Sequence, residues 1–331
     1  MKLEDIGFYT LSDKRAKEAD HTTRLSRCEI ILTDKCNFKC PYCRGLREDI
    51  KGVMPYEHAK EMVEYFISEK LYAIRFSGGE PTTYPRLNEL VKLAKSGGIE
   101  KIAISTNGSA NTNKYLELID SGVNDFSISL DACCSSMAKT MNGGIDVFDV
   151  IKNNIEVLSK RVYVSVGVVL TEENMSKLEE VVNFAHSLGV KDIRIIPSSQ
   201  HNKLKKEINI DDNVLEEHKI LKYRIENIKK GLPVRGIGIS DTKKCPLVLD
   251  DMAIAGLYHF PCIIYMREQG NPVGTTQNTK TIRKERLDWY RSHNCQEDSI
   301  CRKNCLDVCV AYNNKWEKYQ RETNLENRRL V

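Results

Sequence analysis

Six short apolar runs, separated by stretches of helical periodicity, constrain the fold of this chain more than any other feature. Between the runs, apolar residues recur at three- to four-residue spacing, which is typical of helices that cover one face of a sheet. Strand–helix alternation favours a parallel α/β sheet, and six units are too few to close an eight-stranded barrel. We therefore predict an open, partial (β/α)6 TIM barrel with its functional residues at the C-terminal ends of the strands. The expected strands are Glu29–Thr33, Ala73–Ser77, Lys101–Thr106, Phe126–Leu130, Val162–Leu170 and Asp192–Pro197.

The 12 cysteines are unevenly distributed along the 331 residues. Four lie near the start, two are adjacent in the middle, and six lie in about the last quarter of the chain. The chain has no apolar run near the roughly 18 residues of a membrane helix, and its first residues lack the apolar region of a signal peptide. We therefore expect a cytoplasmic protein, without a membrane partner, whose clustered cysteines bind metal or do redox chemistry.

The two outer cysteine groups indicate cluster-binding regions that flank a core. We expect an N-terminal extension over residues 1–27, followed by the barrel and a charged connecting helix over residues 28–235. Residues 236–331 are expected to form a small domain that a bound cofactor holds together. The connecting helix is expected over Asn213–Lys229, and the periodicity is lost after Gly236. A net charge of +4, 7% aromatic residues and the lack of a basic–aromatic stripe argue against nucleic acid as the partner.

The first cysteine group contains Cys36-Asn37-Phe38-Lys39-Cys40-Pro41-Tyr42-Cys43, directly after the first expected strand. Three thiolates at this spacing can surround one face of a metal centre. They are one short of a closed zinc site or of a 4Fe–4S cluster with four protein ligands, so one iron of such a cluster would stay open. The spacing alone leaves a zinc site with a distant fourth ligand, or loose thiols, as alternatives.

In this triplet and in three further motifs the chain resembles the radical S-adenosylmethionine (SAM) superfamily. A CxxxCxxC loop after the first strand, with an aromatic residue before the last cysteine, is typical of that superfamily. The next three expected strands end in Ser77-Gly78-Gly79-Glu80-Pro81, Ser105-Thr106-Asn107-Gly108 and Ser127-Ile128-Ser129-Leu130-Asp131, in family order. Within the superfamily, the barrel is similar to that of the molybdenum-cofactor GTP 3′,8-cyclases, whose C-terminal cysteine arrangement is absent here.

The resemblance implies a 4Fe–4S cluster held by Cys36, Cys40 and Cys43, with the amino and carboxylate groups of SAM on the open iron. It implies that SAM is cleaved reductively to a 5′-deoxyadenosyl radical, which abstracts a hydrogen from the substrate. An electron donor such as flavodoxin or ferredoxin is then a partner.

The same resemblance implies which residues contact SAM. The backbone of Gly78 and Gly79 would approach the methionine moiety, Glu80 would lie near its amino group, and Tyr42 would border the adenine. Further candidates are Ser105 and Asn107, then Ser129 and Asp131 at the ribose or methionyl end, with strand-end capping as the structural alternative for the last two. Arg194 is a candidate clamp for the carboxylate of SAM or for a substrate carboxylate or phosphate, and an ion pair at the barrel bottom is its alternative.

The C-terminal cysteines resemble the auxiliary-cluster extensions of radical SAM enzymes, called SPASM with two clusters and twitch with one. Ser292 stands where the resemblance expects the first cysteine of a CxxC pair. Six thiols suffice for one fully ligated 4Fe–4S cluster with two left over, so one auxiliary cluster is expected. Two clusters, or zinc and unligated thiols, remain alternatives. The candidate ligands are Cys245, Cys262, Cys295, Cys301, Cys305 and Cys309.

Cys133 and Cys134 closely follow Asp131 and are expected near the substrate pocket. A thiol there could donate a hydrogen atom to a substrate radical, so both are candidate catalytic residues. Burial as small side chains is the structural alternative. The residues around Cys262 are candidates for lining the pocket from the other side: Tyr258, His259, Tyr265, Arg267 and Glu268.

The expected function is thus that of a radical SAM enzyme acting on a small, nucleotide-like or sugar-like metabolite. Modification of a ribosomally made peptide, by epimerisation, cross-linking or oxidation, is the alternative, and it is weakened because only 35 residues precede Cys36. A non-catalytic, cysteine-rich protein that binds metal or nucleic acid is the alternative from another class. A monomer is the default for the oligomeric state.

Overall fold

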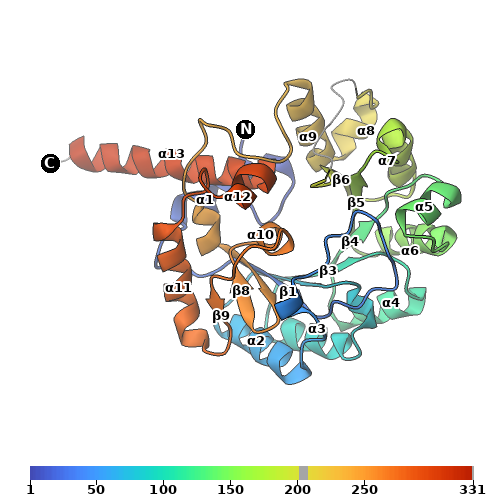
Figure 1. The fold of residues 1–331 in the computed structure, drawn as a ribbon, viewed down its shortest axis with the longest axis horizontal. Coiled ribbons are helices and arrows are strands. Elements are labelled where there is room, and N and C mark those ends of the chain that lie inside the picture. The colour runs from blue at the N-terminus through green and yellow to red at the C-terminus, as the bar shows by residue number, and fades with distance from the viewer. Residues whose placement is uncertain (201–207, 330–331) are drawn as a thin grey trace.

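The computed structural model describes residues 1–200 and 208–329, with side chains up to Thr323. Among these residues, nine strands form one sheet in the order β6-β5-β4-β3-β2-β1-β7-β8-β9 (Figure 1). The strands are β1 (Arg27–Ile31), β2 (Ala73–Ser77), β3 (Lys101–Thr106), β4 (Asp125–Ser129), β5 (Tyr163–Leu170), β6 (Asp192–Pro197), β7 (Asp251–Ala255), β8 (Tyr258–Phe260) and β9 (Gly274–Thr275).

The sheet is parallel from β6 to β7 and antiparallel only in its last two pairs. It stays open, which confirms the predicted α/β fold with a partial barrel. Three of the six predicted strands have the predicted bounds, and the other three are shifted by one or two residues. β1 pairs with β2 on one side and with β7 on the other, so that Ile31 lies opposite both Ser77 and Ala255. The predicted division after residue 235 therefore falls within a chain whose two parts share one sheet.

Six helices lie around the outside of the curved sheet (Figure 1). Each follows the strand–helix alternation expected from the sequence, and each turns an apolar stripe toward the sheet, as Met62, Val63 and Phe66 do in α2. These helices are α2 (Tyr56–Ser68), α3 (Leu87–Ser96), α4 (Thr112–Ser121), α5 (Ser135–Met141), α6 (Phe148–Ser159) and α7 (Leu178–Ser187).

The predicted connecting helix is two helices, α8 (Asp212–Glu217) and α9 (Lys219–Lys229). The break occurs at His218, whose backbone is extended (φ −120°, ψ 90°). The charged segment before them, residues 201–207, lies outside the described residues. None of the helices in the described part of the chain combines the length and the apolar character needed to cross a membrane.

The C-terminal region contains more helix than the loss of periodicity indicated. Four helices occur there: α10 (Ile263–Arg267), α11 (Thr279–Ser292), α12 (Ser299–Asn304) and α13 (Asp307–Arg329). α13 extends beyond the rest of the molecule in Figure 1, and its first half packs against α1 (Asp13–Glu18). Trp316 Nε1 donates to the carbonyl of Ala19 at 2.6 Å, and Lys315 Nζ lies 3.1 Å from Asp13 Oδ2. These polar contacts add to an apolar contact, because Val308 and Tyr312 of α13 are buried in one hydrophobic cluster with Leu3 and Ile6.

Candidate functional site

A cavity of about 560 Å³ lies inside the open barrel. It is lined by residues at the C-terminal ends of the strands and by segments of the C-terminal region, and Cys36, Cys40 and Cys43 all lie in its wall. All 12 cysteines are free. The wall also includes seven other residues predicted for the SAM site: Tyr42, Gly78, Gly79, Ser105, Asn107, Ser129 and Arg194. The structure thus brings together most of the residues that the sequence motifs singled out.

The glycine turn after β2 holds the loop that carries the three cysteines. The backbone N–H of Gly79 donates to the carbonyl of Thr33 at 2.7 Å, and that of Glu80 donates to the carbonyl of Lys35 at 2.8 Å. A Cβ atom on Gly78 would lie 2.5 Å from the Thr33 oxygen, and one on Gly79 would lie 2.3 Å from the Lys35 oxygen. Both positions require glycine, because any side chain would push the two loops apart.

Glu80 is buried and does not line the cavity. Its carboxylate accepts hydrogen bonds from the backbone N–H and the hydroxyl of Thr82, from the hydroxyl of Thr106 and from the backbone N–H of Asn107. Burial raises the pKa of Glu80 above its usual value. The carboxylate therefore braces the loops after β2 and β3, and the structure does not bring it to the place expected for a contact with SAM.

Asn107 connects the loop after β3 to the cysteine loop. Its Nδ2 lies 2.8 Å from Asn37 Oδ1 and 3.9 Å from the Sγ of Cys36. Asn37 in turn donates to the Ser109 hydroxyl at 2.8 Å. Cys36 is thereby positioned by side chains as well as by the glycine turn.

Tyr42 reaches the segment that follows strand β4. Its hydroxyl donates a hydrogen bond to the carboxylate of Asp131, which also accepts from the backbone N–H of Val169 at 2.6 Å. Asp131 itself does not line the cavity, and burial raises its pKa to about 6. Asp131 thus orients Tyr42 from behind, while Tyr42 lines the cavity.

The expectation for Cys133 and Cys134 has to be corrected, because neither lies in the cavity wall. The chain leaves the strand edge after Asp131, whose carbonyl accepts from Asn174 Nδ2 at 2.9 Å. Cys133 packs against the hydrophobic core, and Cys134 is exposed at the N-cap of α5. A hydrogen-donor role for these thiols therefore has no support in their position.

Three arginines from separate segments lie close together in the cavity wall. Burial, together with the charges of Arg235 and Arg267, lowers the pKa of Arg44 to about 10. Arg44 forms an ion pair with Glu268, whereas Arg267 donates to the carbonyls of Gly78 at 2.8 Å and Gly45 at 3.3 Å. Arg44, Arg235 and Arg267 thus bring three guanidinium groups to this part of the cavity wall.

Arg194 lies deeper, on β6, and donates to the hydroxyl of Ser127 on β4. Burial and the nearby charge of Arg75 lower the pKa of Arg194 to about 10. Arg75 pairs with Asp125 at 3.5 Å and donates to the Ser105 hydroxyl at 3.1 Å. The barrel floor is thus a polar network, in which Arg194 is bonded to a hydroxyl rather than paired with a carboxylate.

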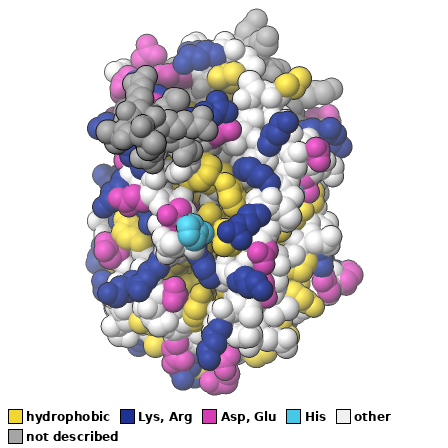
Figure 2. Space-filling model, turned by 90° about the vertical axis from the view of Figure 1, so that its left-hand side faces the viewer, with side chains coloured by type: hydrophobic (Ala, Val, Ile, Leu, Met, Phe, Trp, Pro, Cys, Tyr) yellow, Lys and Arg dark blue, Asp and Glu magenta, His cyan; other side chains and the backbone are white. Residues whose placement is uncertain are grey.

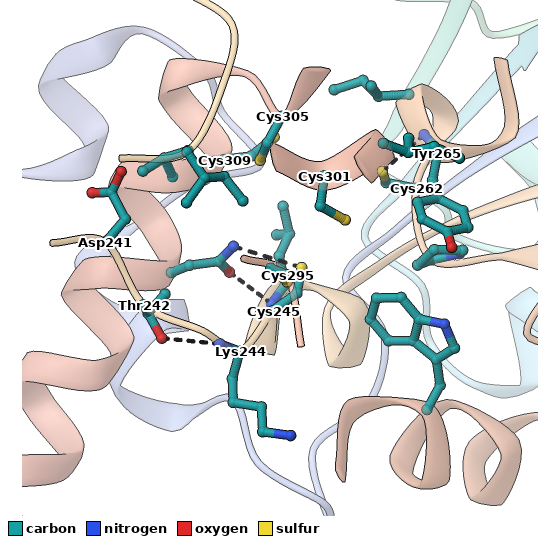
Figure 3. A pocket seen from close by; sticks show the side chains of 18 residues that line it. Asp241, Thr242, Lys244, Cys245, Cys262, Tyr265, Cys295, Cys301, Cys305 and Cys309 are labelled. Atoms are coloured by element: carbon teal, nitrogen blue, oxygen red, sulfur yellow. Dashed lines mark hydrogen bonds between the residues drawn. The ribbon is translucent and has the colours of Figure 1, made fainter. Parts of the chain in front are cut away.

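All six C-terminal cysteines line a second, smaller cavity (Figure 3). They come from three parts of the sequence, at Cys245, at Cys262 and between Cys295 and Cys309, and Figure 3 shows their side chains arranged around one space. Cys262 and Cys309 line both cavities, so the two adjoin. Six thiols therefore lie around one space, two more than a single 4Fe–4S cluster takes as ligands.

Several thiols of both groups have a pKa above the usual value of a cysteine. Burial raises the pKa of Cys40 to about 11 and that of Cys262 still further. Contact with Cys295 and burial raise the pKa of Cys245 well above its usual value. Because the thiolate is the form that binds metal, metal binding would displace these protons. Soft sulfur donors at this density suit iron–sulfur clusters or zinc.

Sequence reasoning did not single out Arg44 or Arg235 as parts of the cavity. Arg44 directly follows Cys43, so its place in the loop was a usable signal. Arg235 had none, since it comes to the cavity through contacts with the distant carbonyls of Pro197 and Asn304. Arg267 lines the cavity as expected, whereas His259 is fully buried and bonded to Glu285 at 2.8 Å.

Comparisons with known proteins agree with this geometry. Residues 30–185 match the profile of the Radical SAM superfamily. A probable GTP 3′,8-cyclase of Sulfurisphaera tokodaii is 26% identical over 203 residues, which cover 60% of this chain and 64% of that protein. The GTP 3′,8-cyclase of Brucella abortus is 26% identical over 175 residues, which cover 50% of this chain and 51% of that protein. The chain therefore spans between half and two thirds of the length of these relatives.

Solved structures with the same fold have lower identity. Streptococcus suis SuiB bound to its precursor peptide SuiA has a TM-score of 0.57 at 16% identity, covering 81% of this chain and 65% of SuiB. The enzyme anSMEcpe with bound AdoMet has a TM-score of 0.56 at 16% identity, covering 91% of this chain and 99% of that one. The matched profile, the motifs and the shared fold agree with the sequence-based prediction: residues 30–185 of this chain are similar to the Radical SAM superfamily, whose enzymes use SAM and an iron–sulfur cluster.

Proposed function

We propose that this chain binds SAM at a 4Fe–4S cluster held by Cys36, Cys40 and Cys43 and uses it to abstract a hydrogen atom from a small anionic metabolite. The observation that carries the proposal is that the three thiols share one cavity with Gly78, Gly79, Asn107 and Ser129. The bound cluster, once reduced by an external one-electron donor, supplies the electron that splits SAM into methionine and a 5′-deoxyadenosyl radical.

The chain's own residues support this chemistry. The Gly78–Gly79 turn presents bare backbone to the methionine end of SAM, because no side chain fits there. Tyr42, fixed by Asp131, borders the adenine side of the cavity. Asn107 faces Cys36 and is placed to orient the cluster loop.

The substrate class follows from the charge of the cavity wall. The charges of Arg235 and Arg267 disfavour the charged form of Arg44, and an anion bound beside these guanidinium groups would offset that repulsion. Guanidinium groups bind phosphate and carboxylate oxygens through paired hydrogen bonds. A phosphorylated or carboxylated metabolite therefore fits this wall, and the nucleotide triphosphate named for the curated relatives is one member of that class.

One auxiliary 4Fe–4S cluster is proposed for the second cavity, with Cys245, Cys262, Cys305 and Cys309 as its ligands. Cys305 and Cys309 contact each other where α12 passes into α13, and Cys262 is close to Cys309. Since Cys262 and Cys309 also line the large cavity, the cluster would face the substrate. Electron transfer to or from a substrate radical is the role that this position favours.

Peptide modification is the second candidate function. It is favoured by the likeness in fold to SuiB, which was solved with a precursor peptide bound. No comparable observation favours a non-catalytic role in nucleic-acid binding. On the face shown in Figure 2, Lys and Arg side chains are interspersed with Asp and Glu instead of forming one continuous basic surface.

The SAM chemistry is tested on the full chain, reconstituted without oxygen. We expect about eight irons per chain, four for each cluster, and 5′-deoxyadenosine after addition of dithionite and SAM. The triple variant Cys36→Ser, Cys40→Ser, Cys43→Ser should lose about half of the iron and all of the 5′-deoxyadenosine. Cys134→Ser, an exposed cysteine outside both cavities, is the matched control and should lose neither. Formation of 5′-deoxyadenosine by the triple variant would contradict the proposal.

The substrate class is tested with inorganic pyrophosphate, which carries the charge without a particular organic group. Calorimetric titration of the SAM-loaded protein should show binding that weakens with added salt. Arg267→Gln should weaken it at least about tenfold, equivalent to about 1.4 kcal/mol. Arg321→Gln, an exposed arginine on α13, should have no effect. If the wild-type protein does not bind pyrophosphate, the proposed anionic substrate is wrong and a peptide substrate is favoured instead.

A further inference from the structure

His293 lies beside two of the six cysteines of the second cavity, Cys295 and Cys301. The Nε2 of His293 lies 3.6 Å from the Sγ of Cys301. With the Sγ of Cys295 added, the three donor atoms all lie within 4.8 Å of one another. Among the residues that the structure describes, this is the one group of three His, Cys, Asp or Glu side chains that is this compact.

The three side chains are held in place from outside the group. The His293 ring stacks on Trp289, with 3.9 Å between ring centroids and 16° between planes. The edge of the Tyr265 ring packs against the same imidazole. The backbone N–H of Cys295 donates to the carbonyl of Lys243 at 2.8 Å, and that of Cys301 donates to Asp298 at 2.8 Å. The donors are therefore arranged by packing and backbone contacts before any ion binds.

The spacing of the donors fits a single ion. A zinc–thiolate bond of about 2.3 Å and a zinc–imidazole bond of about 2.05 Å at a tetrahedral angle place sulfur and nitrogen about 3.6 Å apart. The distance between Cys301 and His293 is the same. Ligands on different irons of a cubane lie farther apart, because the iron–iron distance is added to the separation. A mixed sulfur and nitrogen set of tetrahedral geometry favours zinc over other divalent ions.

The number of donors points the same way. Six thiols line the cavity, the imidazole of His293 lies beside two of them, and a 4Fe–4S cluster takes four thiolates. Assigning Cys245, Cys262, Cys305 and Cys309 to the cluster leaves Cys295, Cys301 and His293 without a function. Those three are the compact group.

We propose that His293, Cys295 and Cys301 bind one zinc ion, separate from the auxiliary cluster, with a solvent molecule in the fourth position. Binding forms two Zn–S bonds and one Zn–N bond and releases the two thiol protons to solvent. The ion joins the end of α11 to α12, two helices that form one side of the cysteine cavity. This site goes beyond the proposed SAM chemistry and does not depend on it.

The test measures zinc and iron in the full chain after anaerobic reconstitution in the presence of both metals. We expect about one zinc per chain beside the iron, and zinc-edge X-ray absorption that fits sulfur at about 2.3 Å and nitrogen at about 2.0 Å. Competition with a chelator should show that His293→Gln retains zinc at least about tenfold more weakly, with the iron content unchanged. His293→Cys, which restores a ligand, should retain zinc. His21→Gln, an exposed histidine far from the cavity, is the matched control.

Two results would overturn the inference. The first is a wild-type protein without stoichiometric zinc. The second is loss of zinc from the double variant Cys305→Ser, Cys309→Ser, because the ion would then have occupied the cluster ligands. Failure of the SAM chemistry is distinguishable from both, since it abolishes 5′-deoxyadenosine and leaves the zinc content and its dependence on His293 intact.

Discussion

The hydroxyl of Tyr42 donates a hydrogen bond to the buried carboxylate of Asp131, and this bond ties the cysteine loop to the end of β4. Tyr42→Phe removes the donor and leaves Asp131 short of a partner. We expect the free energy of unfolding to fall by about 1–3 kcal/mol, measured by urea denaturation. Tyr72→Phe, whose hydroxyl makes no hydrogen bond among the described residues, is the control and should change stability little. Equal stability of the Tyr42 variant and wild type would show that the bond contributes nothing.

The raised pKa of Asp131 predicts how stability varies with pH. Its folded-state pKa of about 6 lies above the usual 3.8, so between these values the folded protein binds a proton that the unfolded chain does not. This contribution is complete below pH 3.8 and is lost as the pH rises through 6. A shift of about two units corresponds to about 3 kcal/mol. The difference in unfolding free energy between wild type and Asp131→Asn should change by about that amount between pH 4 and pH 7, and a constant difference would contradict the assignment.

A variant of Glu80 can show whether its carboxylate supports the loops or contacts SAM. In Glu80→Gln, one of the two oxygens becomes an amide NH2 group, which faces donors instead of accepting from them. We expect a loss of about 1–3 kcal/mol of stability and a lower iron content, because the loop that supports the cysteines loosens. Glu64→Gln, on the exposed face of α2, is the control. A variant with wild-type stability and iron but weaker SAM binding would instead support the direct contact predicted from the motif.

Gly79 tests the close approach of the two loops. In Gly79→Ala the new methyl group would lie 2.3 Å from the Lys35 carbonyl oxygen, so backbone must move. We expect a destabilisation of about 1–3 kcal/mol together with incomplete iron loading. Gly167→Ala is the matched control for stability and iron, because its methyl group would meet its nearest atom at 4.0 Å. Iron loading of Gly79→Ala at the wild-type level would show that the loop adapts without cost.

Much of the barrel could be predicted because its pattern is local. Strand β2 and strand β3 have the bounds expected from the sequence, and the motif residues at their ends lie in one cavity. These predictions rest on short apolar runs and on residues adjacent in the chain. The helices α11 and α13 were missed for different reasons. In α11 the buried side chains are few, Ile282 and Arg286, and in α13 the apolar positions Val308 and Tyr312 stand among charged residues that hide their periodicity.

The parts of the site that sequence reasoning could not supply depend on contacts between distant residues. Glu80 belongs to a recognisable motif, yet nothing local shows that Thr106 and Asn107 occupy its oxygens. Cys133 and Cys134 are only two and three positions beyond Asp131, but a change in chain direction takes them out of the cavity. The position of a residue in a motif therefore predicted that it lies near the site. Whether its side chain lines the cavity depends on tertiary contacts that the motif does not show.

The pairing of β1 with β7 has a consequence for the synthesis of the protein. Arg27 and Asp251, which pair across these strands, are 224 positions apart, so the second neighbour of β1 is translated long after β1 itself. At the usual speed of ribosomes this interval lasts roughly 10 to 45 seconds. During that time the nascent chain carries an open strand edge beside the cysteine loop, and such an edge is prone to pair with other chains. The second edge of β1 therefore stays unpaired until residues 251–255 have been synthesised.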